Sequence, residues 1–164
     1  MIFIGLGGNL SSWAGSPLQT CTAALSHLER GGVNILRCSY WYKTEPVPSS
    51  DQPWFVNAVA EVQTQHNPRE LLHLLHSVEE LFERERSTLN EARTLDLDLL
   101  AFHGLVWGPG ESPPILPHPR LHMRAFVLLP MLDIAPEWRH PVLGETTREM
   151  SQRLASDHKV LRLC

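Results

Sequence analysis

The stretch Thr94-Leu95-Asp96-Leu97-Asp98-Leu99-Leu100-Ala101-Phe102 begins with leucine and aspartate in strict alternation. Successive side chains of a β-strand point to opposite faces of a sheet, so this period of two predicts a strand that buries its leucines. The same period places Asp96 and Asp98 together on the other face, roughly 7 Å apart at their Cα atoms. The stretch therefore predicts a sheet that carries two carboxylates on one face.

Five elements are predicted before this strand from hydrophobic periodicity and turn residues. In chain order they are a strand at 1–6, a helix that begins at Pro17 and ends before Gly31, strands at 33–43 and 55–63 on either side of a proline loop at 44–48, and a helix at 68–82. The order strand, helix, strand, strand, helix, strand is that of an α+β ferredoxin-like sandwich. In that fold both helices pack on one face of an antiparallel sheet, which leaves the other face for ligands.

The helix at 68–82 has the clearest start signal. Asn67 is a good N-cap, Pro68 suits the first helical position, and Glu70 completes a capping box. Beyond the aspartate strand, the patterns predict a short edge strand at 105–107, a helix at 125–134 despite its internal proline, and a closing strand at 159–163.

Length and composition favour one globular domain over residues 1–164. The chain is 43% hydrophobic and 20% charged, and it contains neither a signal peptide pattern nor an apolar run long enough to span a membrane. We therefore expect a cytoplasmic protein with no membrane partner. Its three cysteines, Cys21, Cys38 and Cys164, are widely spaced and are expected to be reduced thiols. The net charge of -4 argues against a nucleic-acid partner.

Asp96 and Asp98 are the candidate metal ligands. Mg²⁺ prefers a few carboxylate oxygens and completes its octahedron with water and phosphate oxygens, which a pair of exposed aspartates allows. Two ions bridged between the aspartates are also feasible. The alternative is an amphipathic strand whose acidic face is merely solvated, and the strand pattern by itself favours that interpretation.

Several arginines surround the aspartates in sequence. Arg84 and Arg86 follow the long helix, Arg93 precedes the aspartates, and Arg120 and Arg124 follow them. Arginine forks suit phosphate oxygens, although basic residues at the end of a helix also interact favourably with its dipole. Residues two apart on a helix do not share a face, so the helix must end or unwind at Arg84 and Arg86 if both arginines are to reach one phosphate.

A second candidate site contains aromatic and amide side chains. Phe55 and Asn57 lie on one face of the third predicted strand, where a buried amide needs a polar partner. An amide both donates and accepts hydrogen bonds, as does a pyrimidinone edge, and Phe55 and Phe126 could stack on a flat ring. The alternative is that both aromatic rings belong to the core and that Asn57 bonds to the backbone.

Five motifs together resemble the 6-hydroxymethyl-7,8-dihydropterin pyrophosphokinase family over nearly the whole chain. They are Gly7-Gly8-Asn9-Leu10, Tyr42-Lys43-Thr44-Glu45-Pro46, Phe55-Val56-Asn57-Ala58, Arg93-Thr94-Leu95-Asp96-Leu97-Asp98-Leu99-Leu100 and Leu116-Pro117-His118-Pro119-Arg120. The resemblance implies a ferredoxin-like fold and the transfer of pyrophosphate from Mg-ATP to the pterin hydroxymethyl group, which releases AMP, in folate biosynthesis. The chain's partners would be these two small molecules, and we expect a monomer.

The resemblance also implies a role for each matching residue. Asp96 and Asp98 would hold two Mg²⁺ ions, and Arg86 and Arg93 would be arginines of a catalytic loop. The pterin would contact Thr44, Glu45, Val47, Phe55, Asn57 and Phe126. The nucleotide and its phosphates would contact Glu79, Arg84, His118 and Arg124.

The chain departs from the family pattern in the loop at 87–92. Asn90-Glu91-Ala92 replaces a tryptophan-glycine-proline sequence, and the loop is about one residue shorter. Pro113 and Pro119 stand where an arginine and a tyrosine are expected. These differences raise the alternative of a degenerate paralogue that binds pterin or nucleotide with little turnover. A ferredoxin-like RNA-binding module is a third alternative, which the acidic pair at 96 and 98 disfavours.

Overall fold

The computed structural model describes residues 1–84, 91–110, 112–154 and 159–163. The strands are β1 (Ile2–Gly8), β2 (Val33–Cys38), β3 (Tyr42–Thr44), β4 (Phe55–Thr64), β5 (Asp96–Phe102) and β6 (Val160–Arg162). The helices are α1 (Pro17–Arg30), α2 (Pro68–Leu81), α3 (Ala125–Ile134) and α4 (Thr147–Gln152), with a 3₁₀ turn at Leu121–Met123. Both expected helices of the ferredoxin-like order are present, and the fold prediction is confirmed.

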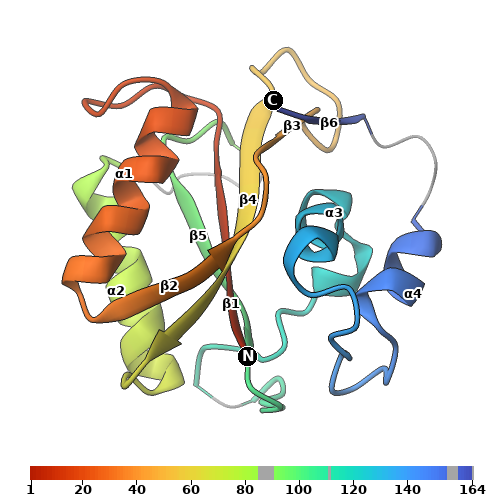
Figure 1. Ribbon diagram of the computed structural model, residues 1–164. Helices are drawn as coiled ribbons and strands as arrows, with labels where there is room; N and C mark the ends of the chain where they lie inside the picture. The colour runs from red at the N-terminus through yellow and green to blue at the C-terminus, as the bar shows by residue number, and fades with distance from the viewer. Residues whose placement is uncertain (85–90, 111, 155–158, 164) are drawn as a thin grey trace.

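All strand pairs in the sheet are antiparallel. The strand order is β5-β1-β4-β3-β6, and β2 pairs with the other half of the long strand β4. Figure 1 shows α1 and α2 on one side of the sheet and α3 and α4 on the other. The second face is therefore partly covered by helices that the ferredoxin-like order does not include, and only part of it is left for ligands.

Strand periodicity explains how the sheet forms two cores. Ile2, Ile4 and Leu6 of β1 belong to the core beneath α1 and α2. Phe3 points the other way, into the core formed with α3 and α4. Pro130 lies inside α3 and is buried, so the helix predicted there is confirmed.

The strand predicted at 33–43 is two strands. The first strand ends at Cys38, although the Ser39 amide still donates to the Val59 carbonyl at 2.9 Å and the Ser39 hydroxyl accepts the Val59 amide at 3.0 Å. The next amide, that of Tyr40, donates to Asp133 of α3 at 3.1 Å. A side chain from another element thus replaces a ladder bond, which a strand pattern cannot reveal. The edge strand expected at 105–107 is also wrong, because the described backbone forms only an isolated bridge there, between Trp107 and Leu116.

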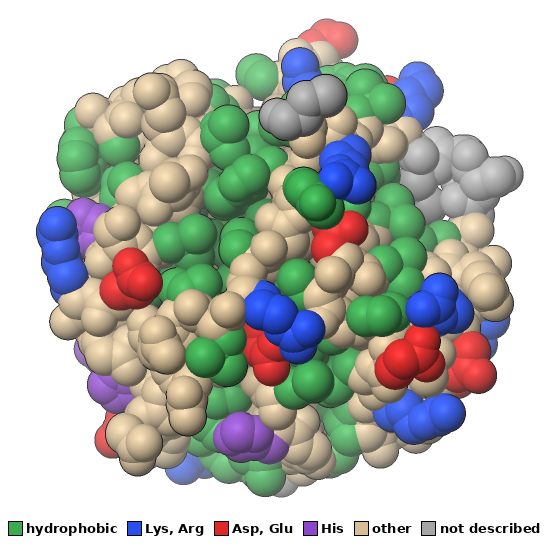
Figure 2. Space-filling model, viewed as in Figure 1, with side chains coloured by type: hydrophobic (Ala, Val, Ile, Leu, Met, Phe, Trp, Pro, Cys, Tyr) green, Lys and Arg blue, Asp and Glu red, His purple; other side chains and the backbone are tan. Residues whose placement is uncertain are grey.

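Figure 2 shows basic and acidic side chains interspersed on the face viewed in Figure 1, among hydrophobic and other groups. Within the described ranges, no helix combines the length and the apolar character that crossing a membrane requires.

The end of α2 matters for the candidate site. Its start is the expected capping box, since Asn67 accepts the Glu70 amide at 3.0 Å and Glu70 accepts the Asn67 amide at 2.8 Å. The helix ends at Leu81, and Glu83 follows with a left-handed φ of 61°. The Arg84 amide then donates back to the Glu79 carbonyl at 3.2 Å. The helix thus ends before Arg84, whereas Arg86 lies outside the described residues.

A glycine at position 83 should stabilise the protein. A left-handed conformation costs a residue with a side chain about 1–2 kcal/mol. Glycine removes this cost, but it also raises the entropy of the unfolded chain, which offsets part of the gain. We expect Glu83→Gly to raise the free energy of unfolding by up to about 1 kcal/mol, measured by urea denaturation. Glu80→Gly, within α2 and with the same charge change, should instead lower it by a similar amount. Equal destabilisation by both variants would contradict this geometry of the helix end.

Candidate active site

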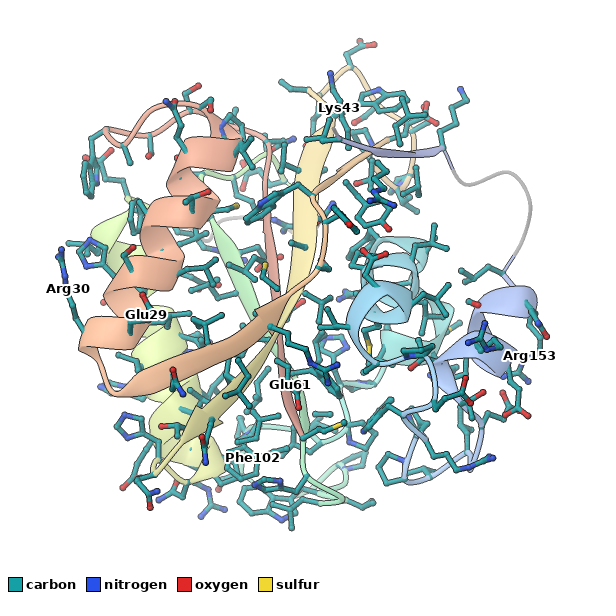
Figure 3. All side chains as sticks on the ribbon, in the orientation of Figure 1. Glu29, Arg30, Lys43, Glu61, Phe102 and Arg153 are labelled. Carbon is teal, nitrogen blue, oxygen red and sulfur yellow. The ribbon has the colours of Figure 1, made fainter. Side chains whose placement is uncertain are left out.

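Two cavities lie side by side at one end of the sheet, and Asp96 lines both. In Figure 3, Lys43 of β3 marks this end and Phe102 of β5 marks the opposite one. The first cavity has a volume of about 230 Å³ and the second a volume of about 300 Å³. Asp98 lines the second cavity. The predicted aspartate pair therefore separates two spaces, each with its own set of side chains.

The floor of the first cavity is a row across three strands. Gly7 of β1 pairs with Asp96 of β5 on one side and with Asn57 of β4 on the other. Cross-strand partners share a face, so the carboxylate and the amide flank a position without a side chain. A Cβ atom at Gly7 would lie 2.6 Å from the amide oxygen of Asn57. Glycine is therefore required to leave this floor open.

The first cavity brings together all six residues predicted to contact a pterin. These are Thr44, Glu45, Val47, Phe55, Asn57 and Phe126. Asn57 is buried, and its amide nitrogen donates to the hydroxyl of Thr44 at 2.7 Å. The partner that a buried amide needs is thus a side chain of β3, so its carbonyl oxygen remains oriented toward the floor beside Gly7. The cavity combines two aromatic rings with an oriented amide.

Arginines link the carboxylates to the aromatic rings. Arg93 lies 3.3 Å from an oxygen of Asp96, and its guanidinium lies 5.2 Å from the centre of the Phe55 ring. Arg124 makes the equivalent pair of contacts, 3.1 Å from Asp98 and 5.3 Å from the centre of the Phe126 ring. Although Arg124 is predicted to bind nucleotide, the structure places it on the first cavity. Each of these two cations is thus held between an aromatic ring and a carboxylate.

Glu79 and Arg84 connect α2 to the edge strand β5. One oxygen of Glu79 accepts the Leu97 amide at 2.7 Å and a guanidinium N–H of Arg84 at 2.6 Å. Arg84 also forms an ion pair with Asp96. Burial lowers the pKa of Arg84, but the neighbouring Asp96 and Glu79 carboxylates outweigh it and raise this pKa above its ordinary value. Glu79 therefore satisfies a buried backbone group on the edge strand β5 and fixes a permanent cation beside Asp96.

The second cavity contains the remaining predicted nucleotide residues, Glu79, Arg84 and His118. Its wall is partly apolar, because Pro113 and Pro119 contribute to it. The Arg120 amide donates to Nδ1 of His118 at 3.1 Å, so this nitrogen is an acceptor and the proton of the neutral ring is on Nε2. Burial is the main cause that lowers the pKa of His118, and Arg124 and Arg120 add to it while Asp98 opposes it.

Sequence patterns missed some lining residues and could not place others. Gly7, Arg120 and Met123 line the first cavity without having been assigned to it, and His76 lines the second. The residue period of β1 gives the face on which Gly7 lies, but its cross-strand neighbours depend on the strand order, which the sequence pattern does not give. Arg86, predicted to be catalytic, lies outside the described residues.

The aspartates fit magnesium better than a transition metal. No group of three or more His, Cys, Asp or Glu residues that could hold an ion occurs in the part of the chain that the structure describes. Two half-exposed carboxylates without imidazole or thiolate suit a hard cation that keeps water and phosphate as its other ligands. Each carboxylate oxygen also has two lone pairs, so pairing with arginine does not use up its capacity to bind a metal ion.

A cavity lined by two aromatic rings beside a carboxylate, and a second cavity that contains Arg84 and His118, are the features expected of a transferase that brings an aromatic substrate to a phosphate donor. Residues 3–136 match the model of the 7,8-dihydro-6-hydroxymethylpterin-pyrophosphokinase family. The chain belongs to this family.

Relatives support the same assignment. A 2-amino-4-hydroxy-6-hydroxymethyldihydropteridine pyrophosphokinase of Methylorubrum extorquens is 33% identical over 153 residues, which cover 93% of this chain and 92% of the relative. The folic acid synthesis protein fol1 of Pneumocystis carinii is 35% identical over 97% of this chain, but this match covers only 20% of the fungal protein. A solved HPPK-DHPS triple mutant of Plasmodium falciparum superposes with a TM-score of 0.70 at 17% identity, over 93% of this chain and 42% of its own, and shows the shared fold.

Gly7→Ala should close the floor of the first cavity. The added methyl group would displace the Asn57 amide, and we expect the affinity for 6-hydroxymethyl-7,8-dihydropterin, the ligand in the family name, to fall by about 10- to 200-fold in calorimetric titrations. Gly5→Ala is the matched control on the same strand face, because its methyl group would make an ordinary 3.5 Å contact with Leu100. Unchanged affinity in Gly7→Ala would show that the ligand does not lie on this floor.

His118 should remain neutral at pH 7. Its pKa is lowered from the ordinary value of 6.5, so NMR titration of the imidazole should give a midpoint below that of an unfolded peptide. As the pH falls below 6.5, the unfolded chain binds this proton before the folded protein does. His118 should therefore lower the free energy of unfolding below pH 6.5 and leave it unchanged at higher pH. Arg124→Ala removes a nearby cation and should raise the midpoint; a midpoint above 6.5 in the intact protein would contradict the argument.

Proposed function

We propose that the chain transfers pyrophosphate from Mg-ATP to 6-hydroxymethyl-7,8-dihydropterin, yielding AMP and the pterin pyrophosphate for folate synthesis. The pterin occupies the cavity between Phe55 and Phe126, with its pyrimidinone edge at Asn57. The triphosphate occupies the second cavity, beside Arg84 and His118. The position of Asp96 on the walls of both cavities carries this proposal, because a group must pass between the two substrates at that point.

Asp96 and Asp98 would hold the magnesium in this arrangement. Bound Mg²⁺, which we propose to be two ions, supplies neutralisation of the phosphate charge during transfer. The two carboxylates supply two negative charges that would attract the ions, and their spacing along one strand face suits ions shared between them. The arginines that contact the carboxylates, Arg84, Arg93 and Arg124, are within reach of phosphate oxygens next to the same ions.

The protein's main contribution to the rate is then positioning. Stacking between Phe55 and Phe126 fixes the plane of the pterin, and the Asn57 amide fixes its rotation within that plane. These contacts direct the hydroxymethyl oxygen toward the aspartate pair for in-line attack on the β-phosphorus of ATP. Arg86 is proposed to assist from the loop. We further propose that the protein acts as a monomer.

The product distinguishes this function from its alternatives. Incubation with Mg-ATP and the pterin should yield AMP in equal amount to the pterin consumed, whereas ADP would indicate a different phosphoryl transfer. Binding of both substrates without release of either nucleotide would favour the degenerate paralogue suggested by the residues at 87–92.

Asp96→Asn should abolish most of the AMP formation. The substitution keeps the shape of the side chain but removes a metal-binding charge, and we expect kcat to fall by at least about 100-fold. Glu29→Gln, an equal charge change on α1 at an exposed position, should leave kcat unaltered. Both variants should unfold cooperatively in a thermal melt. A fully active Asp96→Asn enzyme would overturn the metal assignment.

A further inference from the structure

Asn9 lies just beyond β1, outside both cavities, and connects two segments that supply the site. Its side chain is almost fully buried, with 3% exposure. The side-chain oxygen accepts the Arg93 amide at 2.8 Å, and the side-chain nitrogen donates to the Pro53 carbonyl at 2.9 Å and to Gln52 at 3.2 Å. The Asn9 amide also donates to the Arg93 carbonyl at 2.9 Å. Asn9 therefore bonds both backbone polar groups of Arg93.

The contacts of the Arg93 side chain do not by themselves fix its position. Its Nε atom is buried and has no hydrogen-bond partner among the described residues. The guanidinium lies 5.2 Å from the centre of the Phe55 ring and its Nε lies 3.3 Å from Asp96, and neither a cation–π contact nor a long ion pair is strongly directional. The hydrogen-bonded backbone then determines where the side chain begins.

The segment beside Asn9 packs too closely to shift freely. A Cβ atom on Gly8 would lie 2.5 Å from the carbonyl oxygen of Thr94, so the turn after β1 is in direct contact with the chain entering β5. On the other side, Gln52 and Pro53 lead within two residues into Phe55 and β4. Asn9 thus fixes the start of the strand with the metal-binding aspartates relative to the start of the strand with the pterin-stacking ring.

We infer that Asn9 is a positioning residue for the transfer reaction, which holds Arg93 between the Phe55 ring and Asp96 through its side-chain amide. The inference rests on the proposed role of Arg93 in that reaction. The amide oxygen of Asn9 bonds Arg93, and the amide nitrogen bonds the segment that leads to Phe55. The two halves are separable, because an aspartate side chain retains the acceptor and loses the donor.

Steady-state kinetics of AMP formation tests the inference. Asn9→Ala should lower kcat by about 10- to 100-fold, because a displacement of about 1 Å at a catalytic group has effects of this size. Asn9→Asp should retain more of kcat and should mainly raise KM for the pterin, because its second oxygen would face the Pro53 carbonyl. Ser39→Ala is the control for general destabilisation, since Ser39 is also buried and accepts a backbone amide, but beside α3.

A double variant separates positioning from a structural role. If Asn9 acts through Arg93, Asn9→Ala should reduce kcat by no more than about twofold in an Arg93→Ala background. Full multiplication of the two losses would overturn the inference, as would Asn9→Ala kinetics no worse than those of Ser39→Ala.

Amide hydrogen exchange provides a readout that does not depend on activity. The Arg93 amide should exchange faster in Asn9→Ala and stay protected in Asn9→Asp; equal protection in all forms would overturn the inference. The two proposals fail in different ways. A wild-type protein that forms no AMP contradicts the proposed function, whereas an active wild type with an equally active Asn9→Ala variant contradicts only the role of Asn9.

Discussion

The two halves of the site meet across β1, at one position that must lack a side chain. Gly7 of β1 separates Asp96 from Asn57, and the register of β1 with both neighbours places the carboxylate and the amide on the same face. A methyl group at Gly7 would collide with Asn57. Because β1 lies between β5 and β4, the hydrogen bonds that hold it in place also set the distance between the aspartates of β5 and Phe55 and Asn57 of β4. The sheet itself is therefore the scaffold on which the two cavities lie next to each other.

Charge must be balanced on this scaffold before any ligand binds. Two carboxylates on one strand face repel each other, and three arginines from separate parts of the chain contact them. Arg84 is held most firmly, because Glu79 is buried and binds it as well as the edge of β5. Arg93 and Arg124 have aromatic rings as their other neighbours and remain closer to the first cavity. The aspartates thus have one firmly held cation, Arg84, and two cations that also line the first cavity.

Sequence periodicity predicted the parts of this arrangement that depend on neighbours along the chain. The alternation at Asp96 and Asp98, the capping box at Asn67 and the shared face of Phe55 and Asn57 all depend on local geometry. The break after Cys38 was missed because a distant side chain, Asp133, takes the backbone amide of Tyr40. The role of Gly7 was missed for the same kind of reason, since a glycine in a strand has meaning only when its cross-strand partners are known.

The departures from the family pattern fall in two places: directly before Arg93, and at Pro113 and Pro119, which line the second cavity. Neither place includes Asp96, Asp98, Phe55 or Asn57. Those residues lie on strands or at helix ends, and their positions depend on the sheet register and on Glu79. The altered residues at 90–92 directly precede Arg93, which is bonded at both its amide and its carbonyl by Asn9. The chain thus has a fixed point where the unusual loop joins the site. We therefore expect a change directly before Arg93 to leave the side chains on β4 and β5 in place.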